Sequence, residues 1–328
     1  MAAANAKKLK SLRNFMSIKP DQEILRSYLR HDIEMFKDVF LVTIHRNWSS
    51  HAPFELTELG ITTYDRRSVN NGEAIELRPH AEAIFSGVWS LHLRITSFAH
   101  LPSATGDPNA YHFGTTTFAS PEVAMELLHD IWNQPIDEFA PELGMRPVIC
   151  MHFGANNGIS KMRKAQFDFD PSSFVTNVAV LDAQNIAVQA KITGSTNASL
   201  EYLLCQFRIT PFDCGNAGNA AMYTTVVATL SALRNELYQA VDNPRAKPGQ
   251  KGESSAKPAQ RVMQWLMDRP TPPSPFGLLV YCTRCGSGEH CFEECSCADL
   301  SCSRCESSVH SWRRANAGTH IDGVCVFR

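Results

Sequence analysis

The sequence predicts an α/β domain with a mixed β-sheet and flanking helices, followed by a small cysteine-rich module. Residues 39–44 and 147–153 are nearly continuous apolar runs, as in strands that are buried on both faces of a sheet. Segments with helical spacing alternate with strand-like runs, which is typical of α/β domains. Cysteine is unevenly distributed, because eight of the 11 cysteines lie in the last 47 residues. Without a secretory signal, this crowding favours a metal site in a reducing compartment over disulfides.

The strands are expected in the following order along the chain. Residues 39–44 lead into the polar tripeptide His45-Arg46-Asn47, and the carboxyl end of a central strand is where α/β domains usually build a site. Residues 54–64 alternate apolar and polar side chains, as in a half-buried strand paired with the first. The further strands are expected at 91–95, 147–153 and 174–181.

The helices are expected between and after these strands. Residues 1–35 are mostly helical. Ser120 and Pro121 indicate a helix start, because serine caps the first backbone N–H groups and proline fits the first turn. A short helix should follow the polar turn at 154–158 and run through Met162. A long helix should cover 217–241, with one apolar stripe at helical spacing. The stripe comprises Met222, Val226, Leu230, Leu233 and Leu237.

Composition divides the chain into four parts. Residues 1–35 form a basic N-terminal extension, and residues 36–242 form the α/β domain. Residues 243–275, rich in Pro, Gly and Lys, predict a linker with one short helix at 261–267, whose Trp265 could dock on the domain. Residues 276–328 form the cysteine-rich module. No run of 18 apolar residues occurs, so no membrane span is expected.

Two sets of metal ligands lie in the cysteine-rich module. The first set has the Cys-x2-Cys-x4-His-x4-Cys spacing of a zinc knuckle, in which four side chains surround one Zn²⁺ ion as a tetrahedron. Its members are Cys282, Cys285, His290 and Cys295.

The second set repeats the beginning and the end of the first. It comprises Cys302, Cys305 and Cys325 with a histidine. Either His310 or His320 can be that ligand, and the spacing of His320 from the last cysteine slightly favours it. Cys291 and Cys297 are left over and could be alternative ligands. We therefore expect two structural Zn²⁺ ions, because a module of this size buries too little core to fold without them.

Zinc knuckles of this spacing usually bind single-stranded nucleic acid, whose bases stack on an exposed aromatic side chain. Phe292 in the first set and Trp312 in the second are the candidates for stacking. Nearby arginines could contact phosphates: Arg284, Arg304, Arg313 and Arg314. Protein binding is the competing role for such a module.

Three stretches resemble the motifs of the ribonuclease H-like DEDDh 3′–5′ exonucleases. The first is the buried strand that ends at His45-Arg46-Asn47, followed by Glu58-Leu59-Gly60. The second is the strand at 148–152 with its asparagine-rich turn. The third is Gly215-Asn216-Ala217-Gly218-Asn219-Ala220-Ala221. A fungal branch associated with Argonaute and small-RNA silencing has His-Asn-Ala-Gly-Asn-Asp-Ala there. The resemblance covers about two thirds of the chain and implies a ribonuclease H-like mixed sheet.

The catalytic residues of that family do not carry over to this sequence. The first motif has Asp and Glu where this chain has His45 and Asn47. The second motif has Asp where this chain has Asn157, or Gly158 if the turn is one residue longer. The third motif has its general-base His and its metal-binding Asp at the positions of Gly215 and Ala220.

Hydrolysis with two Mg²⁺ ions needs carboxylates to hold the metals and a base to activate water. We therefore do not expect Mg²⁺ binding or catalysis at these positions. Acids elsewhere could form a displaced site, although capping and turn formation would explain Asp182 and Asp213 as well. The acids considered are Asp168, Asp170, Asp182 and Asp213.

We expect a nucleic-acid-binding protein, with RNA as the preferred ligand, whose inactive exonuclease-like domain and zinc knuckles serve as a scaffold or adaptor in RNA silencing or processing. Two alternatives remain open. One is an active metal-dependent 3′–5′ exonuclease with displaced acids, and the other is a zinc-knuckle adaptor that binds only proteins. The expected partners are single-stranded nucleic acid and silencing or RNA-processing proteins, in the cytoplasm or the nucleus.

Overall fold

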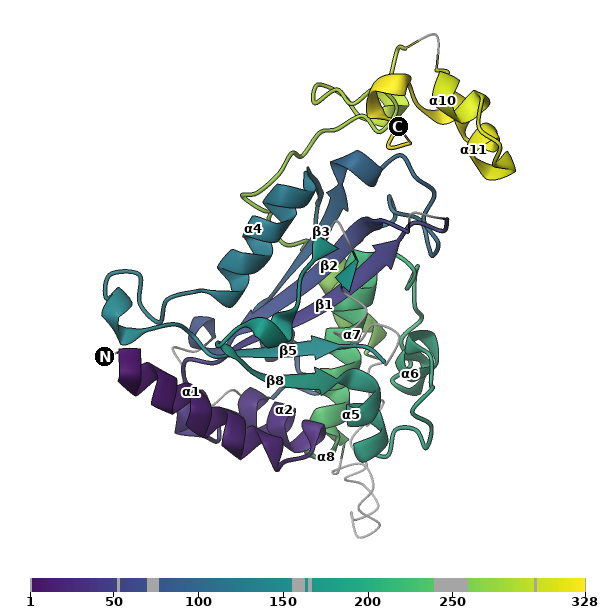
Figure 1. Ribbon diagram of the computed structural model, residues 1–328. Helices are drawn as coiled ribbons and strands as arrows, with labels where there is room; N and C mark the ends of the chain where they lie inside the picture. The colour runs from purple at the N-terminus through teal and green to yellow at the C-terminus, as the bar shows by residue number, and fades with distance from the viewer. Residues whose placement is uncertain are drawn as a thin grey trace, which may run out of the picture.

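The computed structural model has a central six-stranded mixed sheet with the strand order β4-β3-β2-β1-β5-β8 (Figure 1). The structure describes residues 2–51, 54–69, 77–154, 163–164, 167–238, 259–297 and 300–327. The strands of the sheet are β1 (Phe40–Trp48), β2 (Leu56–Asp65), β3 (Val88–Ile95), β4 (Thr116–Ala119), β5 (Val148–His152) and β8 (Asn177–Asp182). β1 pairs with β2 antiparallel and with β5 parallel. The expected mixed α/β sheet is confirmed.

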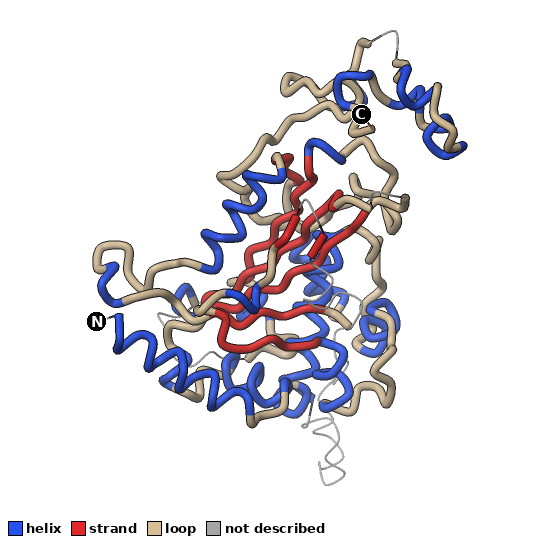
Figure 2. Tube along the Cα trace, viewed as in Figure 1, coloured by secondary structure: helices blue, strands red, loops and turns tan. Residues whose placement is uncertain are grey.

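Helices cover both faces of this sheet (Figure 2). They are α1 (Ala2–Ser17), α2 (Asp21–Leu29), α3 (Glu82–Phe85), α4 (Pro121–Trp132), α5 (Ala183–Gln189), α6 (Leu200–Gln206), α7 (Ala217–Ala232), α8 (Arg234–Tyr238), α9 (Gln260–Met267), α10 (Ser303–Glu306) and α11 (Ser311–Ala315). Successive side chains of a strand point to opposite faces. Leu41 accordingly joins the core under α7, α2 and α5, and Val42 joins the core under α4.

Helix α4 begins as its sequence predicts. The side chain of Ser120 accepts a hydrogen bond from the N–H of Val123, and Pro121 occupies the first turn. Strand β8 begins at Asn177, three residues later than expected, because Pro171–Ser173 forms a 3₁₀ turn before it. The short helix expected to run through Met162 falls outside the described residues. None of the described helices has both the length and the apolar character needed to cross a bilayer.

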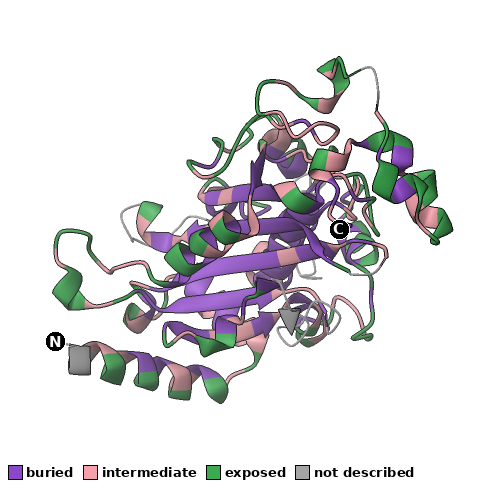
Figure 3. Ribbon diagram, turned by 45° about the horizontal axis from the view of Figure 1, so that its top comes forward, coloured by how far each residue is buried: buried purple, intermediate pink, exposed green. Residues whose placement is uncertain are grey.

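Helix α7 is shorter and more deeply buried than its pattern predicts. It ends at Ala232, and α8 follows after Leu233; residues 239–241 of the expected helix lie outside the described chain. The residues of the expected stripe lie in or against the core, and every other residue of α7 is buried as well. The reason is that the sheet lies on one side of α7, while α2, α5 and α6 lie on the other. The Thr225 hydroxyl is satisfied there by the hydroxyls of Thr43, at 2.8 Å, and Thr62, at 2.6 Å. Figure 3 shows the strands buried along most of their length.

The chain after the core domain returns to it twice. Val262, Met263 and Leu266 of α9 are buried in the core that contains α7, and Trp265 packs against that core, as expected. Leu278 then pairs with Phe118 of β4 through backbone hydrogen bonds of 2.7 and 2.8 Å. The described part of the segment expected as a linker is therefore attached to the domain, whereas residues 243–258 lie outside the described chain. The domain boundaries themselves stay a prediction.

Candidate functional site

The first and third motif positions meet where the carboxyl end of β1 reaches the start of α7, which we call the β1–α7 junction. Asn47 Nδ2 donates a hydrogen bond of 2.6 Å to the carbonyl oxygen of Gly215. The Thr105 hydroxyl donates to the same oxygen at 3.0 Å. Two donors from β1 and from the loop after β3 therefore converge on the backbone just before α7.

The loop at residues 103–112, which sequence patterns did not identify, covers the junction. Its Asp107 N–H donates to the Asp213 carboxylate at 2.7 Å, and its Asp107 carbonyl accepts from Asn216 Nδ2 at 3.1 Å. Asn219 Nδ2 donates to the carbonyl of Ala110 at 2.7 Å. Both asparagines of the third motif therefore hold this loop in place. The turn-forming sequence Gly106-Asp107-Pro108-Asn109 was the signal available for it.

Space at the junction is too small for side chains at Gly215 and Gly60. A Cβ added to Gly215 would lie 2.4 Å from the backbone nitrogen of Gly106, so a histidine there would displace the loop. A Cβ added to Gly60 of β2 would lie 1.8 Å from the carbonyl oxygen of Ala217. Ala220 is fully buried in the core. Sheet, helix and loop therefore fill the junction with backbone and small side chains.

His45 stands at the first motif position on β1. Burial, together with the charge of the adjacent Arg46, lowers the pKa of His45 to about 4 despite the opposing effect of Glu58. Its Nδ1 has no hydrogen-bond partner within the described chain. His45 is therefore a neutral imidazole at pH 7, unlike the carboxylate that the family has there.

A buried carboxylate, Glu58 of β2, lies beside the junction and was not singled out as a site residue from the sequence. Its Oε2 is 3.0 Å from His92 Nε2 and accepts from the N–H of Ala217 at 3.3 Å. His92 Nδ1 in turn lies 2.9 Å from the Thr116 hydroxyl. Burial raises the pKa of Glu58, but His92, the Ala217 N–H and Asn47 more than offset this and hold the pKa below its ordinary value. Glu58 is therefore ionised and bonded to its neighbours. Its place in the Glu58-Leu59-Gly60 stretch of the first motif was the signal available for it.

The acids considered for a displaced site mostly bond to backbone N–H groups. Asp182 caps α5, accepting from the N–H of Gln184 at 2.9 Å, and also accepts from Gly154. Asp213 accepts from Asp107, Gly215 and Asn216. The interpretation of Asp182 and Asp213 as capping and turn residues is confirmed. Asp170 caps a 3₁₀ turn, and Asp168 is exposed on β7 (Phe167–Asp168). Asn157 and Gly158 fall outside the described residues.

Two groups of cysteine and histidine side chains in the C-terminal module could each hold a metal ion. They are Cys282, Cys285, His290 and Cys295, and Cys302, Cys305, His320 and Cys325. Within each group the four ligand atoms lie within 4.8 Å of one another. The structure therefore brings His320, and not His310, to the second group.

The spacing within these groups fits a tetrahedral zinc site. With Zn–S near 2.3 Å and Zn–N near 2.0–2.1 Å, tetrahedral ligand atoms are about 3.5–3.8 Å apart. Cys285 Sγ lies 3.5 Å from His290 Nε2, and Cys305 Sγ lies 3.6 Å from His320 Nε2 and 3.7 Å from Cys325 Sγ. Cys291 and Cys297 are exposed and belong to neither group. The two groups are compatible with one Zn²⁺ ion each.

A comparison with protein families identifies the domain. A family model described as DNA polymerase III subunit epsilon-like, C-terminal domain, of the DEDDh type, matches residues 40–231, more than half of the chain. The chain belongs to this family. The match begins with β1 and ends within α7, so the epsilon-like domain includes the whole sheet and the β1–α7 junction. The ribonuclease H-like fold and its exonuclease-like character are confirmed. A search of curated proteins found no match to the chain.

The second Cys/His group is docked on the epsilon-like domain, at the ends of β1 and β3 (Figure 1). The ring of Trp312 stacks on His51, with ring centroids 4.5 Å apart and an interplanar angle of 15°. His320 contacts His100 at 4.5 Å, and the Tyr281 hydroxyl donates to the carbonyl of Thr96. Cys302, Cys305 and Cys325 belong to the same core cluster as Val42 and α4.

The candidate nucleic-acid contacts differ in how accessible the structure leaves them. Trp312 is half-buried, with His51 stacked on its ring and Phe327 at its edge. Arg313 lies over the Phe327 ring at 3.7 Å. Phe292 is also half-buried, with Arg284 at 5.7 Å over its ring. Arg304 and Arg314 are exposed. Their nucleic-acid contacts stay a prediction.

Proposed function

We propose that this chain binds single-stranded nucleic acid, with RNA preferred, and that its exonuclease-like domain does not hydrolyse it. The observation that carries this proposal is the hydrogen bond between Asn47 and the Gly215 carbonyl under the loop at 103–112. It joins two motif positions between which a hydrolytic member of the family needs metal ions and a base. An amide and a backbone carbonyl bonded to each other supply no carboxylate for Mg²⁺ at these two positions.

The donor set of the junction argues against a two-metal site. His45 is neutral, and Gly215 and Ala220 have no polar side-chain atom. Glu58 is a single carboxylate, whose Oε2 is bonded to His92 and to the Ala217 N–H and whose Oε1 has no hydrogen-bond partner in the described chain. Mg²⁺ requires several oxygen ligands. In the described part of the chain, the groups suited to hold a metal are the two Cys/His sets.

The role proposed for those two sets is structural. Four protein ligands close each site and leave no position for a reactive water, unlike catalytic zinc sites. Bound Zn²⁺ would cross-link the short turns of the module. The second set would also hold Trp312 against His51, and thereby fix the module to the epsilon-like domain.

The nucleic-acid contacts proposed for the module centre on its first Cys/His set. Phe292 and Arg284 form a stacked pair beside that set, suited to a base and its phosphate. Exposed Arg304 and Arg314 add positive charge on the second set. A protein that binds RNA without cleaving it could act as a scaffold or adaptor in RNA silencing or processing, in the cytoplasm or the nucleus.

Incubating the full chain with 3′-end-intact, 5′-labelled single-stranded RNA and Mg²⁺ or Mn²⁺ tests binding and hydrolysis together. We expect binding that weakens with salt and no shortening of the strand. Phe292→Ala should weaken binding roughly tenfold, about 1.4 kcal/mol. Phe139→Ala is the matched control, because Phe139 is 96% exposed on the epsilon-like domain. Its affinity should equal that of the wild type.

Two outcomes would contradict the proposal. Progressive 3′ shortening that is lost in Asp168→Ala or Asp182→Ala would show an active exonuclease with displaced acids. No RNA binding at low salt, in a protein whose zinc content is intact, would favour the adaptor that binds only proteins.

A further inference from the structure

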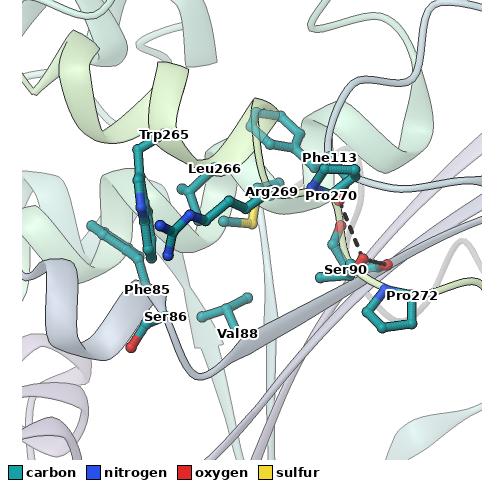
Figure 4. A pocket seen from close by; sticks show the side chains of 12 residues that line it. Phe85, Ser86, Val88, Ser90, Phe113, Trp265, Leu266, Arg269, Pro270 and Pro272 are labelled. Carbon is teal, nitrogen blue, oxygen red and sulfur yellow. Dashed lines mark hydrogen bonds between the residues drawn. The ribbon is translucent and has the colours of Figure 1, made fainter.

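A pair of hollows lies where α9 packs on α3 and on the beginning of β3. The first holds about 270 Å³ and is walled by Phe85, Val88, Phe113 and Trp265 (Figure 4). The second holds about 590 Å³ and lies next to it. Trp265 and Arg269 line both hollows, so we treat the two as one site, the α9 pocket. Its size is within the range of small-ligand sites.

Positive charge dominates the second hollow. Arg78, Arg261 and Arg269 line it, and all three are exposed at its rim. None of them forms an ion pair with a described residue. Glu82 is the acid among the described lining residues, and its carboxylate accepts the backbone N–H of His80 at 2.9 Å. Guanidinium groups that form no ion pair with the described residues favour an anion, and their fork geometry suits phosphate.

A buried histidine gives the α9 pocket a second, independent feature. His80 lines the second hollow and is only 4% exposed. Neither Nδ1 nor Nε2 has a hydrogen-bond partner in the described chain. A buried polar group without a partner is destabilising. A phosphate oxygen in the hollow would accept its ring N–H and remove that cost.

The apolar part of the α9 pocket suits a planar ring. Figure 4 shows the Arg269 guanidinium beside the Trp265 ring, and the two are 5.2 Å apart. Phe85 and Phe113 form the remaining aromatic wall. A base placed against this wall would have its phosphate within the adjoining hollow of arginines and His80. The two hollows together therefore match the two halves of a nucleotide.

The α9 pocket is distinct from the β1–α7 junction. Val88 lines the pocket and is the first residue of β3, whereas Arg94 near the end of β3 pairs with Glu58 beside the junction. The two sites therefore lie at opposite ends of the sheet. The C-terminal module also lies at the end of the sheet that carries the β1–α7 junction, since Tyr281 contacts Thr96 there.

We infer that the α9 pocket binds a nucleoside monophosphate, with the phosphomonoester among Arg78, Arg261 and His80 and the base against Trp265. This chemistry occurs both in a free nucleotide and in the 5′-phosphorylated end of a strand. The inference does not depend on the proposed role of the zinc module, because knuckle contacts do not distinguish a 5′-phosphate from a 5′-hydroxyl.

Equilibrium binding to the full zinc-loaded chain tests the inference with two probes. One is AMP. The other is a single-stranded oligoribonucleotide compared in its 5′-phosphate and 5′-hydroxyl forms. We expect the protein to bind AMP, or to prefer the 5′-phosphorylated strand, and we expect Arg78→Ala/Arg261→Ala to reduce that binding or preference at least tenfold. AMP binding alone identifies free nucleotide, and preference for the phosphorylated strand identifies a strand end.

The matched control removes two charges elsewhere. Lys7 and Lys10 lie on the exposed face of α1. The Lys7→Ala/Lys10→Ala variant should therefore leave AMP binding and the preference between the two strands unchanged. Because Arg78 and Arg261 are exposed, their replacement should not unfold the protein, and His80→Gln provides a second variant that keeps side-chain volume. The inference is overturned if the wild type neither binds AMP nor discriminates the two strands, or if the double arginine variant behaves as the wild type. Failure of Phe292→Ala to weaken RNA binding would affect only the proposed function.

Discussion

Asn47 of β1 donates a hydrogen bond of 2.6 Å to the carbonyl oxygen of Gly215, the residue before the N-cap of α7. Asn47 stands where the DEDDh pattern has a metal-binding Glu, and Gly215 where it has the general-base His. At the β1–α7 junction, the Gly215 carbonyl thus accepts one hydrogen bond from the sheet, donated by Asn47, and one from the loop at 103–112, donated by Thr105. Replacing single residues at this junction should therefore disturb its packing.

Gly215→Ala should destabilise the protein by about 2 kcal/mol, because the new Cβ would lie 2.4 Å from the Gly106 nitrogen and backbone must move to make room. Gly60→Ala should cost more, since its Cβ would lie 1.8 Å from the Ala217 carbonyl oxygen. Gly194→Ala is the control, because nothing lies within 4 Å of its Cβ. Urea denaturation measures all three. Equal midpoints for Gly215→Ala and Gly194→Ala would show that the loop at 103–112 moves to make room for the new Cβ without a measurable loss of stability.

Protonation of His45 should lower the free energy of unfolding as the pH decreases. Its pKa is about 4 in the fold, against about 6.5 in an unfolded chain. Between these values the unfolded state binds more protons, so the stabilisation is complete above pH 6.5 and declines as pH falls towards 4. The total loss of unfolding free energy approaches about 3 kcal/mol. We expect the difference in unfolding free energy between wild type and His45→Gln to shrink from pH 7 to pH 4.5. A difference that is constant over this range would contradict the burial of a neutral imidazole.

The zinc content should be two ions per chain. Cys285→Ser should remove one ion and Cys305→Ser the other, because each belongs to a different group of four ligands. Cys291→Ser and Cys297→Ser should retain both ions, and Cys205→Ser, an exposed cysteine on the epsilon-like domain, is a further control. Elemental analysis of the purified variants gives the count. Loss of an ion in Cys297→Ser would assign that cysteine as a ligand.

The stacked pair His51–Trp312 should couple the C-terminal module to the epsilon-like domain. A double-mutant cycle of His51→Ala and Trp312→Ala should give a coupling free energy of about 0.5–1.5 kcal/mol, as for aromatic pairs in other proteins. Chemical denaturation at a fixed excess of Zn²⁺ measures it. The same cycle with Phe139→Ala in place of Trp312→Ala should give none, because Phe139 is 96% exposed. Additive effects of His51→Ala and Trp312→Ala would show that the module is held by other contacts.

The sequence by itself determined those features that depend on residues close together in the chain. Apolar runs at 39–44 and 147–153 predicted the central strands, and Ser120 with Pro121 predicted the start of α4. Ligand spacing predicted the two Cys/His groups. The motifs also identified the ribonuclease H-like fold, because each motif is a short run of neighbouring residues at the end of a strand or the start of a helix.

The tertiary structure alone decided which distant residues meet. His320 and His310 fit the spacing almost equally, and only folding brought His320 to Cys305. Three contacts join segments that are far apart in sequence: the stacking of Trp312 on His51, the bond of Glu58 to His92, and the bond of Thr105, in the loop at 103–112, to the Gly215 carbonyl. The helical stripe of α7 identified one buried face but not the others, because a helix packed between a sheet and other helices is buried on every face. Such contacts depend on how elements pack, which local periodicity does not encode.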